Sequence, residues 1–354
     1  MDQSTYSPTL DRAFKLLVVL TIVIAALILT KDILVPIVFA ALFSVVLLPI
    51  AKRLEKKIGR IFSIIIVLLI ALLTVAIISW FVISQLTSLV QSLPGIEEKF
   101  YRLITHVNES LSQQFNITTE EQVQYVKEVI KNLSTYASEL LLSTSYLIYF
   151  FIQIPIYIFL FLYYRDRFNR FLLELRPNNT LQWKNEIQQV VRGYISGLAI
   201  VVFIAGALNS IGLLVLGIDH AIFFGFLSGT LTMIPYVGIT IGATLPTLLA
   251  LVTKDSAWYA VGVVGVHGLV QFMEGNFITP KITGSRISIN ALAAVIALLL
   301  AGKIWGIAGM ILAVPAVGIL KILLGYSTSF KPMVVLLGDE TPPNEPVAGL
   351  TPKE

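Results

Sequence analysis

The sequence predicts an all-α integral membrane protein with about eight transmembrane helices, an external helical arm, and proline-broken or re-entrant segments in its C-terminal half. Of its 354 residues, 56% are hydrophobic and only 13% are charged. This composition is incompatible with a surface that water wets on all sides. Uncharged runs of roughly 20 residues are long enough to cross a hydrocarbon core as helices, and too long for the strands of an outer-membrane barrel.

The hydrophobic runs define the spans, and most are separated only by short charged clusters. We expect the first run to be a retained span rather than a signal peptide, because a second run follows directly after Lys31 and Asp32 without a convincing cleavage site. The predicted spans are Phe14–Thr30, Ile33–Ala51, Ile61–Ile83, Leu140–Tyr164, Gly193–Ile218, Ile222–Val252, Ser256–Met273, and the pair Ile287–Gly302 and Ile304–Leu320.

The charges between the runs predict the orientation. The segment Lys52–Arg60 carries five positive charges and one negative, and residues 165–192 carry six and three. Both are therefore expected in the cytoplasm, together with the N-terminus two crossings earlier. Residues 97–139 contain seven Glu against four Lys and Arg, which suits the outside of the membrane.

The polar segment between the third and fourth spans is patterned for helices. Its apolar residues recur at steps of three and four, first from Phe100 to Leu111 and again from Val123 to Leu140. Thr118, with Glu121 three residues later, makes a capping box for the second helix. We expect a helical hairpin outside the membrane, packed either on its own chain or against a neighbouring subunit.

A second amphipathic segment lies on the predicted cytoplasmic side. The stretch "YYRDRFNRFLLELRPNNT" interleaves arginines with Phe168, Phe171, Leu172 and Leu175. It is either an interfacial helix against anionic headgroups or an ordinary basic anchor of a span. Nucleic-acid binding has no support, because the basic residues flank the spans.

These observations divide the chain into five parts. Residues 1–83 form three N-terminal spans, 84–139 the external arm, and 140–192 the fourth span with the cytoplasmic amphipathic segment. Residues 193–330 form a module with proline-broken repeats, and 331–354 a polar tail.

The proline breaks occur in two similar stretches 80 residues apart. "GTLTMIPYVGI" (Gly229–Ile239) and "GMILAVPAVGI" (Gly309–Ile319) share a glycine, a proline six residues later, and the letters VGI. A proline removes a backbone donor and leaves a carbonyl without its helical partner. In lipid such a break is tolerated only where protein or a wet cavity surrounds it. A repeated pair favours a functional break at Pro235 and Pro315 over a commonplace kink.

A polar stretch lies between the two copies. "VHGLVQFMEGNFITPKITGSRISIN" (Val266–Asn290) places many polar groups at the end of a span, and its proline and Gly284 forbid a simple helical continuation. It is an interfacial loop or a gate that coordinates a solute, and we favour the second. The residues concerned are Gln271, Glu274, Asn276, Pro280 and Lys281.

At these residues the chain resembles the autoinducer-2 exporter family of bacterial permeases. The resemblance rests on "IPYVG", "QFMEGNFITPKITGSRISINAL", "GIAGMILAVPA" and the early "ILVPIVFAALFSVVLLPIAKRLEKK", and it covers Phe14 to about Leu324. It implies a multi-span inner-membrane protein of bacteria with both termini cytoplasmic and an oligomeric, pentameric assembly. It also implies export of a quorum-sensing signal of the autoinducer-2 type, or sodium or lithium/proton antiport. Met233 departs from the family pattern, where an asparagine is often found.

Cation/proton antiport and export of a neutral solute require different residue types. An antiporter needs an ionisable group within the bundle, usually a carboxylate. Asp219, Asp255 and Glu274 all lie at predicted span ends, although Glu274 could reach inward from a broken helix. Lys303 is the other candidate, unless it marks a hairpin tip that reaches the interface. A neutral solute needs only uncharged groups, and the candidates are Asn209, Ser228, Thr232, Pro235, Tyr236, Gly238, Gln271, Asn276 and free carbonyls.

Other classes of protein fit less well. The three histidines have no metalloprotease spacing, G-x-S-x-G does not occur, and a P-loop is missing. Without cysteine the chain can form no disulfide and no thiolate metal site. We therefore expect no enzymatic activity, cofactor or metal, and predict a secondary transporter or facilitator in the bilayer, an exporter of a small polar solute rather than an ion antiporter. A scaffold without transport would leave the repeated breaks unexplained.

Overall fold

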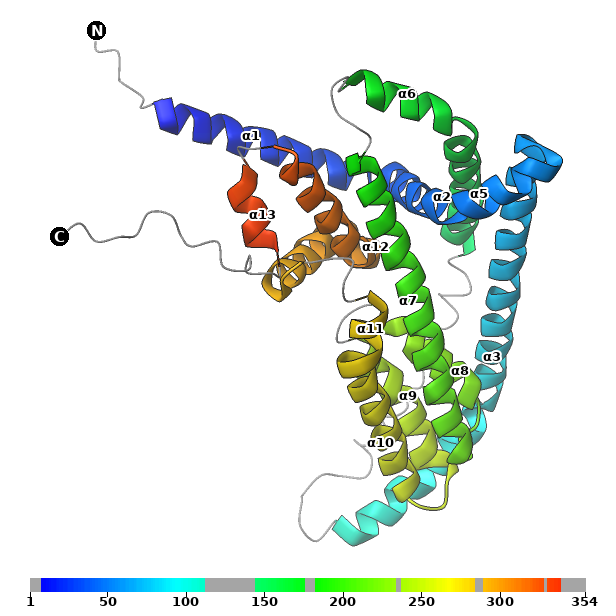
Figure 1. Cartoon of the computed structure of the whole chain (residues 1–354). Helices are drawn as coiled ribbons and strands as arrows, with labels where there is room; N and C mark the ends of the chain where they lie inside the picture. The colour runs from blue at the N-terminus through cyan, green and yellow to red at the C-terminus, as the bar shows by residue number, and fades with distance from the viewer. Residues whose placement is uncertain are drawn as a thin grey trace. The chain divides into compact units, whose positions relative to one another are not determined.

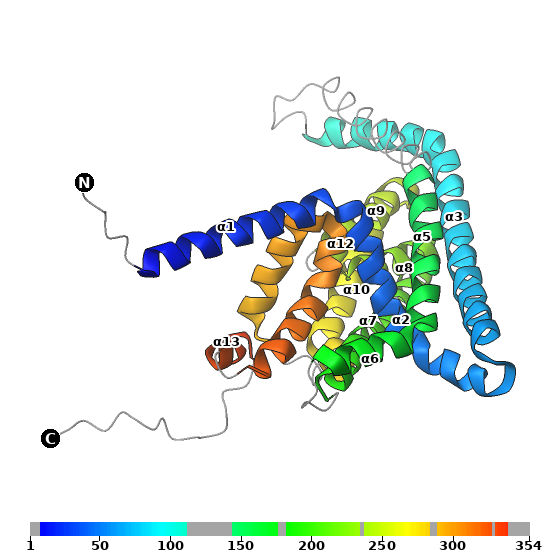
Figure 2. The same ribbon diagram turned by 90° about the horizontal axis from the view of Figure 1, so that it is seen from above.

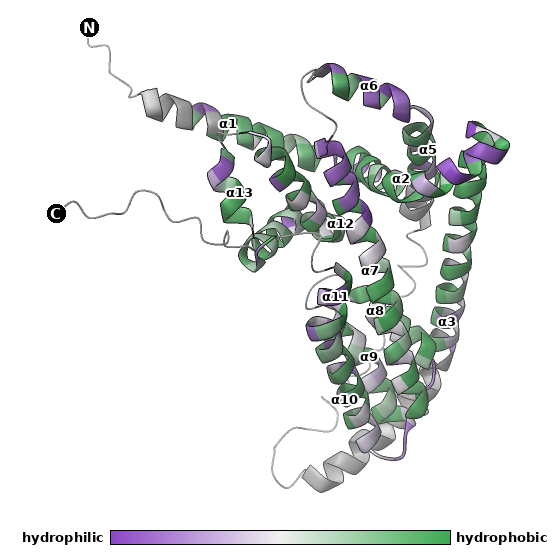
Figure 3. Cartoon of the chain, viewed as in Figure 1, coloured by the Kyte–Doolittle hydropathy of each residue, from purple (hydrophilic) through white to green (hydrophobic). Residues whose placement is uncertain are grey.

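A computed structural model describes residues 8–111, 144–175, 182–233, 237–283, 289–327 and 330–338 (Figure 1). These residues are helical and contain no strand, which confirms the all-α class. The second arm helix and residues 339–354 of the predicted tail lie outside the described residues, whereas residues 331–337 form a short helix. Four described helices are long and apolar enough to cross a membrane: Lys31–Ile58, Arg60–Leu89, Gln182–Val215 and Ala291–Gly325. Figure 3 shows how apolar colour follows these helices for most of their length.

The chain divides into two compact units, which we describe separately. The first contains residues Met1–Val46, Ile156–Tyr194 and Arg286–Glu354. Its elements are α1 (Pro8–Leu29), the first part of α2 (Lys31–Ile58), the end of α5 (Thr144–Tyr163), α6 (Arg165–Leu175), the start of α7 (Gln182–Val215), α12 (Ala291–Gly325) and α13 (Lys331–Leu337).

Side chains that reach backbone carbonyls join the elements of this first unit. Trp305 Nε1 donates to Leu27 O at 3.0 Å, which ties α12 to α1. Tyr194 Oη on α7 donates to Ile311 O at 3.1 Å. Asn290 caps α12 by accepting from Ala293 N at 2.8 Å, the side-chain bond that satisfies a free donor at a helix start.

The helix α12 is two helices joined at a sharp turn. Gly306 has φ 62° and ψ −140°, a conformation that a residue with a Cβ rarely adopts. The two halves then pack closely, since a Cβ at Gly309 would lie 2.6 Å from the carbonyl carbon of Ala301. Figure 2 shows the halves as separate rods that meet at an angle. Lys303 is exposed three residues before the turn, in keeping with a hairpin tip.

The predicted break at Pro315 is wrong. Pro315 is buried inside the second half of α12, where the backbone remains helical, and the break lies nine residues earlier at Gly306. The two similar stretches thus have different structures, because residues 309–319 are continuously helical while the first stretch is divided between two helices. A proline can remain within a membrane helix when its surroundings satisfy the carbonyl that it frees.

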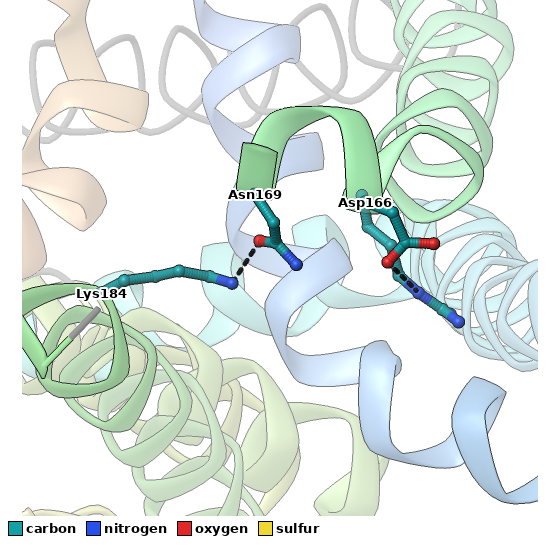
Figure 4. Close-up of polar contacts among 4 residues, drawn as sticks. Asp166, Asn169 and Lys184 are labelled. Atoms are coloured by element: carbon teal, nitrogen blue, oxygen red, sulfur yellow. Dashed lines mark hydrogen bonds and ion pairs between the residues drawn. The ribbon is translucent and has the colours of Figure 1, made fainter. Parts of the chain in front are cut away.

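The amphipathic segment that the sequence analysis predicts on the cytoplasmic side forms α6, a separate helix of 11 residues. Phe168 and Phe171 are exposed on it. Arg165 Nε lies 3.8 Å from Asp166 Oδ1, and Lys184 Nζ donates to Asn169 Oδ1, which links α6 to the start of α7 (Figure 4). An interfacial helix has this form, with rings exposed beside charged groups.

The second unit contains residues Leu47–Pro155 and Ile195–Ser285. It holds α3 (Arg60–Leu111), most of α7, and the elements α8 (Ala221–Leu231), α9 (Val237–Thr253), α10 (Trp258–Met273), η1 (Glu274–Ile278) and α11 (Thr279–Thr283). Gly59, with φ 79°, ends α2 and starts α3. The apolar core of the unit includes Leu213, Ile218, Phe223, Phe224 and Val263.

The end of α7 illustrates how local sequence starts this core. Gly217 has φ 66°, its N–H donates to Leu214 O at 2.9 Å, and Ile218 N donates to Leu213 O at 3.0 Å. This is a Schellman motif, in which a left-handed glycine ends the helix and the apolar residues on either side of it meet. Leu213 and Ile218 are accordingly both buried in the core.

Candidate functional site

The segment Ile222–Val252 turns back on itself as a helical hairpin. α8 ends at Leu231 and α9 begins at Val237. A Cβ at Gly238 would lie 2.8 Å from Thr232 Cα, and one at Gly242 would lie 2.6 Å from Ser228 Oγ. The residues of the second pair lie further from the turn than those of the first, on both sides of it, so α8 and α9 run antiparallel. With 11 residues, α8 is roughly 16 Å long, too short to cross the membrane, so the hairpin is re-entrant.

Small residues allow α8 to approach α7 closely. A Cβ at Gly225 would lie 2.6 Å from Ser210 Cα, and a Cβ at Gly229 would lie 2.7 Å from Gly206 N. Each helix thus presents two small residues four positions apart to the other. This spacing brings membrane helices into backbone contact. Gly229, the first landmark of the predicted repeat, therefore has a packing role of its own.

A buried hydrogen-bonded chain links the hairpin to α10. Ser228 Oγ on α8 lies 2.9 Å from Gly242 O on α9 and 3.0 Å from Nε2 of His267 on α10. The other ring nitrogen, Nδ1, lies 3.0 Å from Val263 O. Ser228 is 2% exposed and His267 is 4% exposed. Three helices that are apolar elsewhere thus meet at one polar chain.

Pro246 explains why Ser228 points at Gly242. Pro246 lies inside α9, four residues after Gly242. A helical carbonyl normally accepts from the N–H four residues later, and proline has none. The Ser228 hydroxyl replaces that missing donor, as serine and threonine do at proline kinks in membrane helices.

Two further buried side chains in this unit have an acceptor without a partner. Asn209 on α7 is 4% exposed, and its Oδ1 is buried without a hydrogen-bond partner among the described residues. Glu274 is 8% exposed, and its Oε2 is in the same situation. A buried acceptor without a donor costs about 1–3 kcal/mol. Such a cost is retained where a ligand supplies the donor during function.

Glu274 stands at an irregularity in the backbone. There α10 gives way to η1, one turn of π-helix from Glu274 to Ile278, before α11 begins at Thr279. Single π-turns are rare and are frequent at functional sites, because the extra residue re-aims the side chains beside it. The carboxylate expected at a span end is therefore buried in the unit.

The other predicted site residues are more dispersed. Thr232 caps the end of α8 and donates its hydroxyl to Gly229 O at 2.7 Å, and Gly238 is buried against it. Asn276 is exposed, and its amide donates to Phe272 O at 2.9 Å. Gln271 is half-buried at the end of α10, Pro280 and Lys281 are exposed on α11, and Pro315 belongs to the other unit. Pro235 and Tyr236 lie outside the described residues.

His267 was not among the residues predicted from the sequence. Among the described residues no cluster of metal-binding side chains is found. The usable signal was the place of His267 in an otherwise uncharged span, since an ionisable residue within a membrane helix marks a functional site by default.

Comparison with known proteins gives a consistent result. Residues 16–329 match the family described as AI-2E family transporter. YrrI of Bacillus subtilis is 28% identical over 316 residues, covering 83% of this chain and 86% of the relative. YueF of the same organism is 25% identical over 303 residues, covering 81% and 82%. The AI-2 transport protein TqsA of Escherichia coli K12 is 21% identical over 331 residues, covering 90% and 93%.

Proposed function

The chain belongs to the AI-2E family of transporters, and we propose that it is a secondary transporter or facilitator that exports a small polar organic solute. A quorum-sensing signal of the autoinducer-2 type is the solute that we propose. The relative TqsA, which matches 90% of this chain, is named as an AI-2 transport protein, and that name supports this substrate class. The proposed setting is the inner membrane of a bacterium, with both termini in the cytoplasm and several copies of the chain in a homo-oligomer.

The observation that carries this proposal is the re-entrant hairpin with buried, uncharged polar groups beside it. Asn209 Oδ1 lacks a donor, and Ser228 and the backbone at the hairpin supply further polar atoms. A solute rich in hydroxyl groups carries the donors that such a site lacks. It needs no buried charge for its recognition, because each of its hydroxyls both donates and accepts.

The role of each residue follows from its place. Asn209, Ser228 and Thr232 are proposed to contact the solute, together with Tyr236, which lies between α8 and α9 in the sequence. Pro235, in the same stretch of sequence, and Gly238, which approaches Thr232 closely, are proposed to belong to the same site. Gln271, Glu274 and Asn276, with Pro280 and Lys281 on α11, are proposed to line the path at the irregular end of α10.

A second candidate function is exchange of sodium or lithium for protons. One specific observation favours it, because Glu274 is buried and its Oε2 has no partner. A carboxylate in that state can bind a cation or a proton in turn. Among the described residues of α7 from Ile195 onward, α8, α9, α10 and η1, Glu274 is the sole carboxylate.

Flux in proteoliposomes separates the two functions. Purified protein would be tested for movement of a labelled autoinducer-2 signal and, separately, for sodium-driven proton movement. The native chain would be compared with Glu274→Gln and with the matched control Asp255→Asn, an exposed acid at the open end of the hairpin. We expect signal flux to persist within about twofold in both variants. Sodium-dependent proton flux that only Glu274→Gln abolishes would instead establish the antiporter.

A further inference from the structure

We propose that His267, Ser228 and the carbonyls of Val263 and Gly242 form a proton-binding site whose occupancy locks the re-entrant hairpin to α10. The bound proton completes a hydrogen-bonded chain that runs from α10 through α8 to α9. The ligand is a proton, and the site is distinct from the carboxylate of Glu274.

The hydrogen-bonded chain needs one hydrogen more than neutral His267 and Ser228 can supply. The chain has three contacts at hydrogen-bond distance, Val263 O to Nδ1, Nε2 to Ser228 Oγ, and Ser228 Oγ to Gly242 O. Three hydrogen bonds need three hydrogens. A neutral imidazole and a hydroxyl carry two, whereas an imidazolium and a hydroxyl carry three.

The acceptors in the chain fix the direction that each hydrogen must take. Both carbonyls at the ends of the chain accept only, so Nδ1 must donate to Val263 O and the hydroxyl must donate to Gly242 O. Nε2 must then donate to Ser228 Oγ. This arrangement is satisfied throughout only when both ring nitrogens carry a proton, so neutral His267 always leaves one of the three contacts without a hydrogen.

Pro246 makes the unsatisfied contact costly. Without the proline, the N–H of residue 246 would bond Gly242 O, and the hydroxyl would be free to donate to Nε2. Neutral His267 would then donate from Nδ1 to Val263 O, and every group would be satisfied. Because of the proline, the Ser228 hydroxyl has two possible acceptors, Gly242 O and Nε2 of neutral His267, but only one hydrogen. A third hydrogen on the ring removes this conflict.

The surroundings of the ring contain little else that titrates. α10 packs against α9 and η1, and its Gly262 and Val266 face Leu216, just after the end of α7, and Gly212 of α7. The described residues of α7 from Ile195 onward, α8 and α9 carry no ionisable side chain. On α10 and η1 the other titratable groups are Tyr259 and Glu274. Glu274 lies seven residues further on, nearly two turns away and about 10 Å along the same helix face.

The sign of the pH effect follows from this arrangement. At low pH the imidazolium donates two charge-assisted bonds, and the hairpin is held to α10. At higher pH one link is lost, and α8 or α9 is released. This last step rests on the proposed function, because the released hairpin is then the part that moves with the solute.

Nitrogen-15 spectra of histidine rings test the site itself, without transport. The chain has three histidines, so the full protein in nanodiscs, labelled at histidine, gives three ring systems that His106→Gln and His220→Gln assign. We expect the His267 ring to become doubly protonated, with both N–H groups hydrogen-bonded, as the pH is lowered from about 8 to 4.5. A ring that stays neutral down to pH 4.5 would overturn the proposal.

Pro246→Ala is the sharpest variant, because it changes no group that takes part in the hydrogen-bonded chain, restores a backbone donor and removes only two buried ring carbons. We expect neutral His267 in this variant to carry its proton on Nδ1, and the proton affinity of the ring to fall about tenfold, because the neutral ring gains the hydrogen bond that it lacks in the native chain. Pro315→Ala, a helical proline in the other unit, is the matched control and should leave the ring unchanged. An unchanged titration in Pro246→Ala would refute the argument.

Flux measurements then connect the site to transport. We expect signal flux to vary with pH in the native chain and in His220→Gln, and to become independent of pH between about 5 and 8 in His267→Gln. Retained pH dependence in His267→Gln would overturn the lock. Absence of flux in the native chain would count against the proposed function alone, because the ring titration is measured separately.

Discussion

At the scale of single residues, the site is marked by polar groups that folding leaves short of partners. Within the part of the chain that the structure describes, Asn209 Oδ1 and Glu274 Oε2 are buried without a hydrogen bond, and the Ser228–His267 chain is one hydrogen short when the ring is neutral. Each of these unsatisfied polar groups lowers the free energy of unfolding, a cost that an apolar side chain at the same position would not have. Their presence in an apolar bundle is best explained by a ligand that supplies what is missing.

Asn209→Leu tests this trade between stability and function. We expect the variant to be as stable as the native chain or more stable by about 1–2 kcal/mol, because it removes a buried unsatisfied acceptor. Signal flux should fall at least tenfold. Thermal unfolding in detergent and proteoliposome flux measure the two effects. Asn185→Leu, at an exposed position on α7 outside the proposed site, is the matched control, and an Asn209→Leu variant that transports normally would remove Asn209 from the site.

At the scale of elements, close backbone contact holds the hairpin to α7. The four small residues Gly206, Ser210, Gly225 and Gly229 set this distance, and a side chain at Gly225 would meet the backbone of Ser210. Backbone atoms cannot move aside as the end of a flexible side chain can. The position of Ser228, one residue before Gly229, depends on the same contact.

Gly225→Ala should therefore disturb the whole hairpin. We expect a loss of about 1–3 kcal/mol in stability, the cost of overpacking a tight core, together with loss of flux. Gly268→Ala is the matched control, because a Cβ at Gly268 would meet nothing within 4 Å. Thermal unfolding of the two variants in the same detergent gives the difference. Equal stability of the two would show that α7 and α8 do not require this approach.

At the scale of the whole molecule, the re-entrant hairpin decides on which side the later segments lie. A hairpin returns the chain to the side from which it entered, so Asp219 and Asp255 should both face outside in the predicted orientation. α10 then leads back toward the cytoplasm. A single broken crossing would invert everything after residue 252.

Cysteine labelling in cells measures this topology directly. The chain has no cysteine, so Asp219→Cys, Asp255→Cys and Lys57→Cys each introduce a single thiol at an exposed position. We expect a membrane-impermeant maleimide to label positions 219 and 255 in intact cells, and position 57 only after permeabilisation. Labelling of 219 and 255 from opposite sides would exclude the hairpin.

The sequence by itself determined the hydrophobic runs, the predicted orientation and the family, because hydrophobicity, charge and motifs are properties of contiguous residues. Helix ends such as the Schellman motif at Gly217 are also local, since they involve neighbours along the chain. For the same reason, Glu274 and Asn209 could be named as candidates from their residue type and place in a span.

Only the tertiary structure decided how the broken segments turn and which polar groups meet. Proline alone does not specify a break, as Pro315 shows, because the surrounding protein determines whether the helix continues. Ser228 and His267 are 39 residues apart, and their contact depends on the glycines that bring α8 and α9 together. The proton site could not be seen in the sequence, because it arises from a hydrogen count over three helices that no local pattern records.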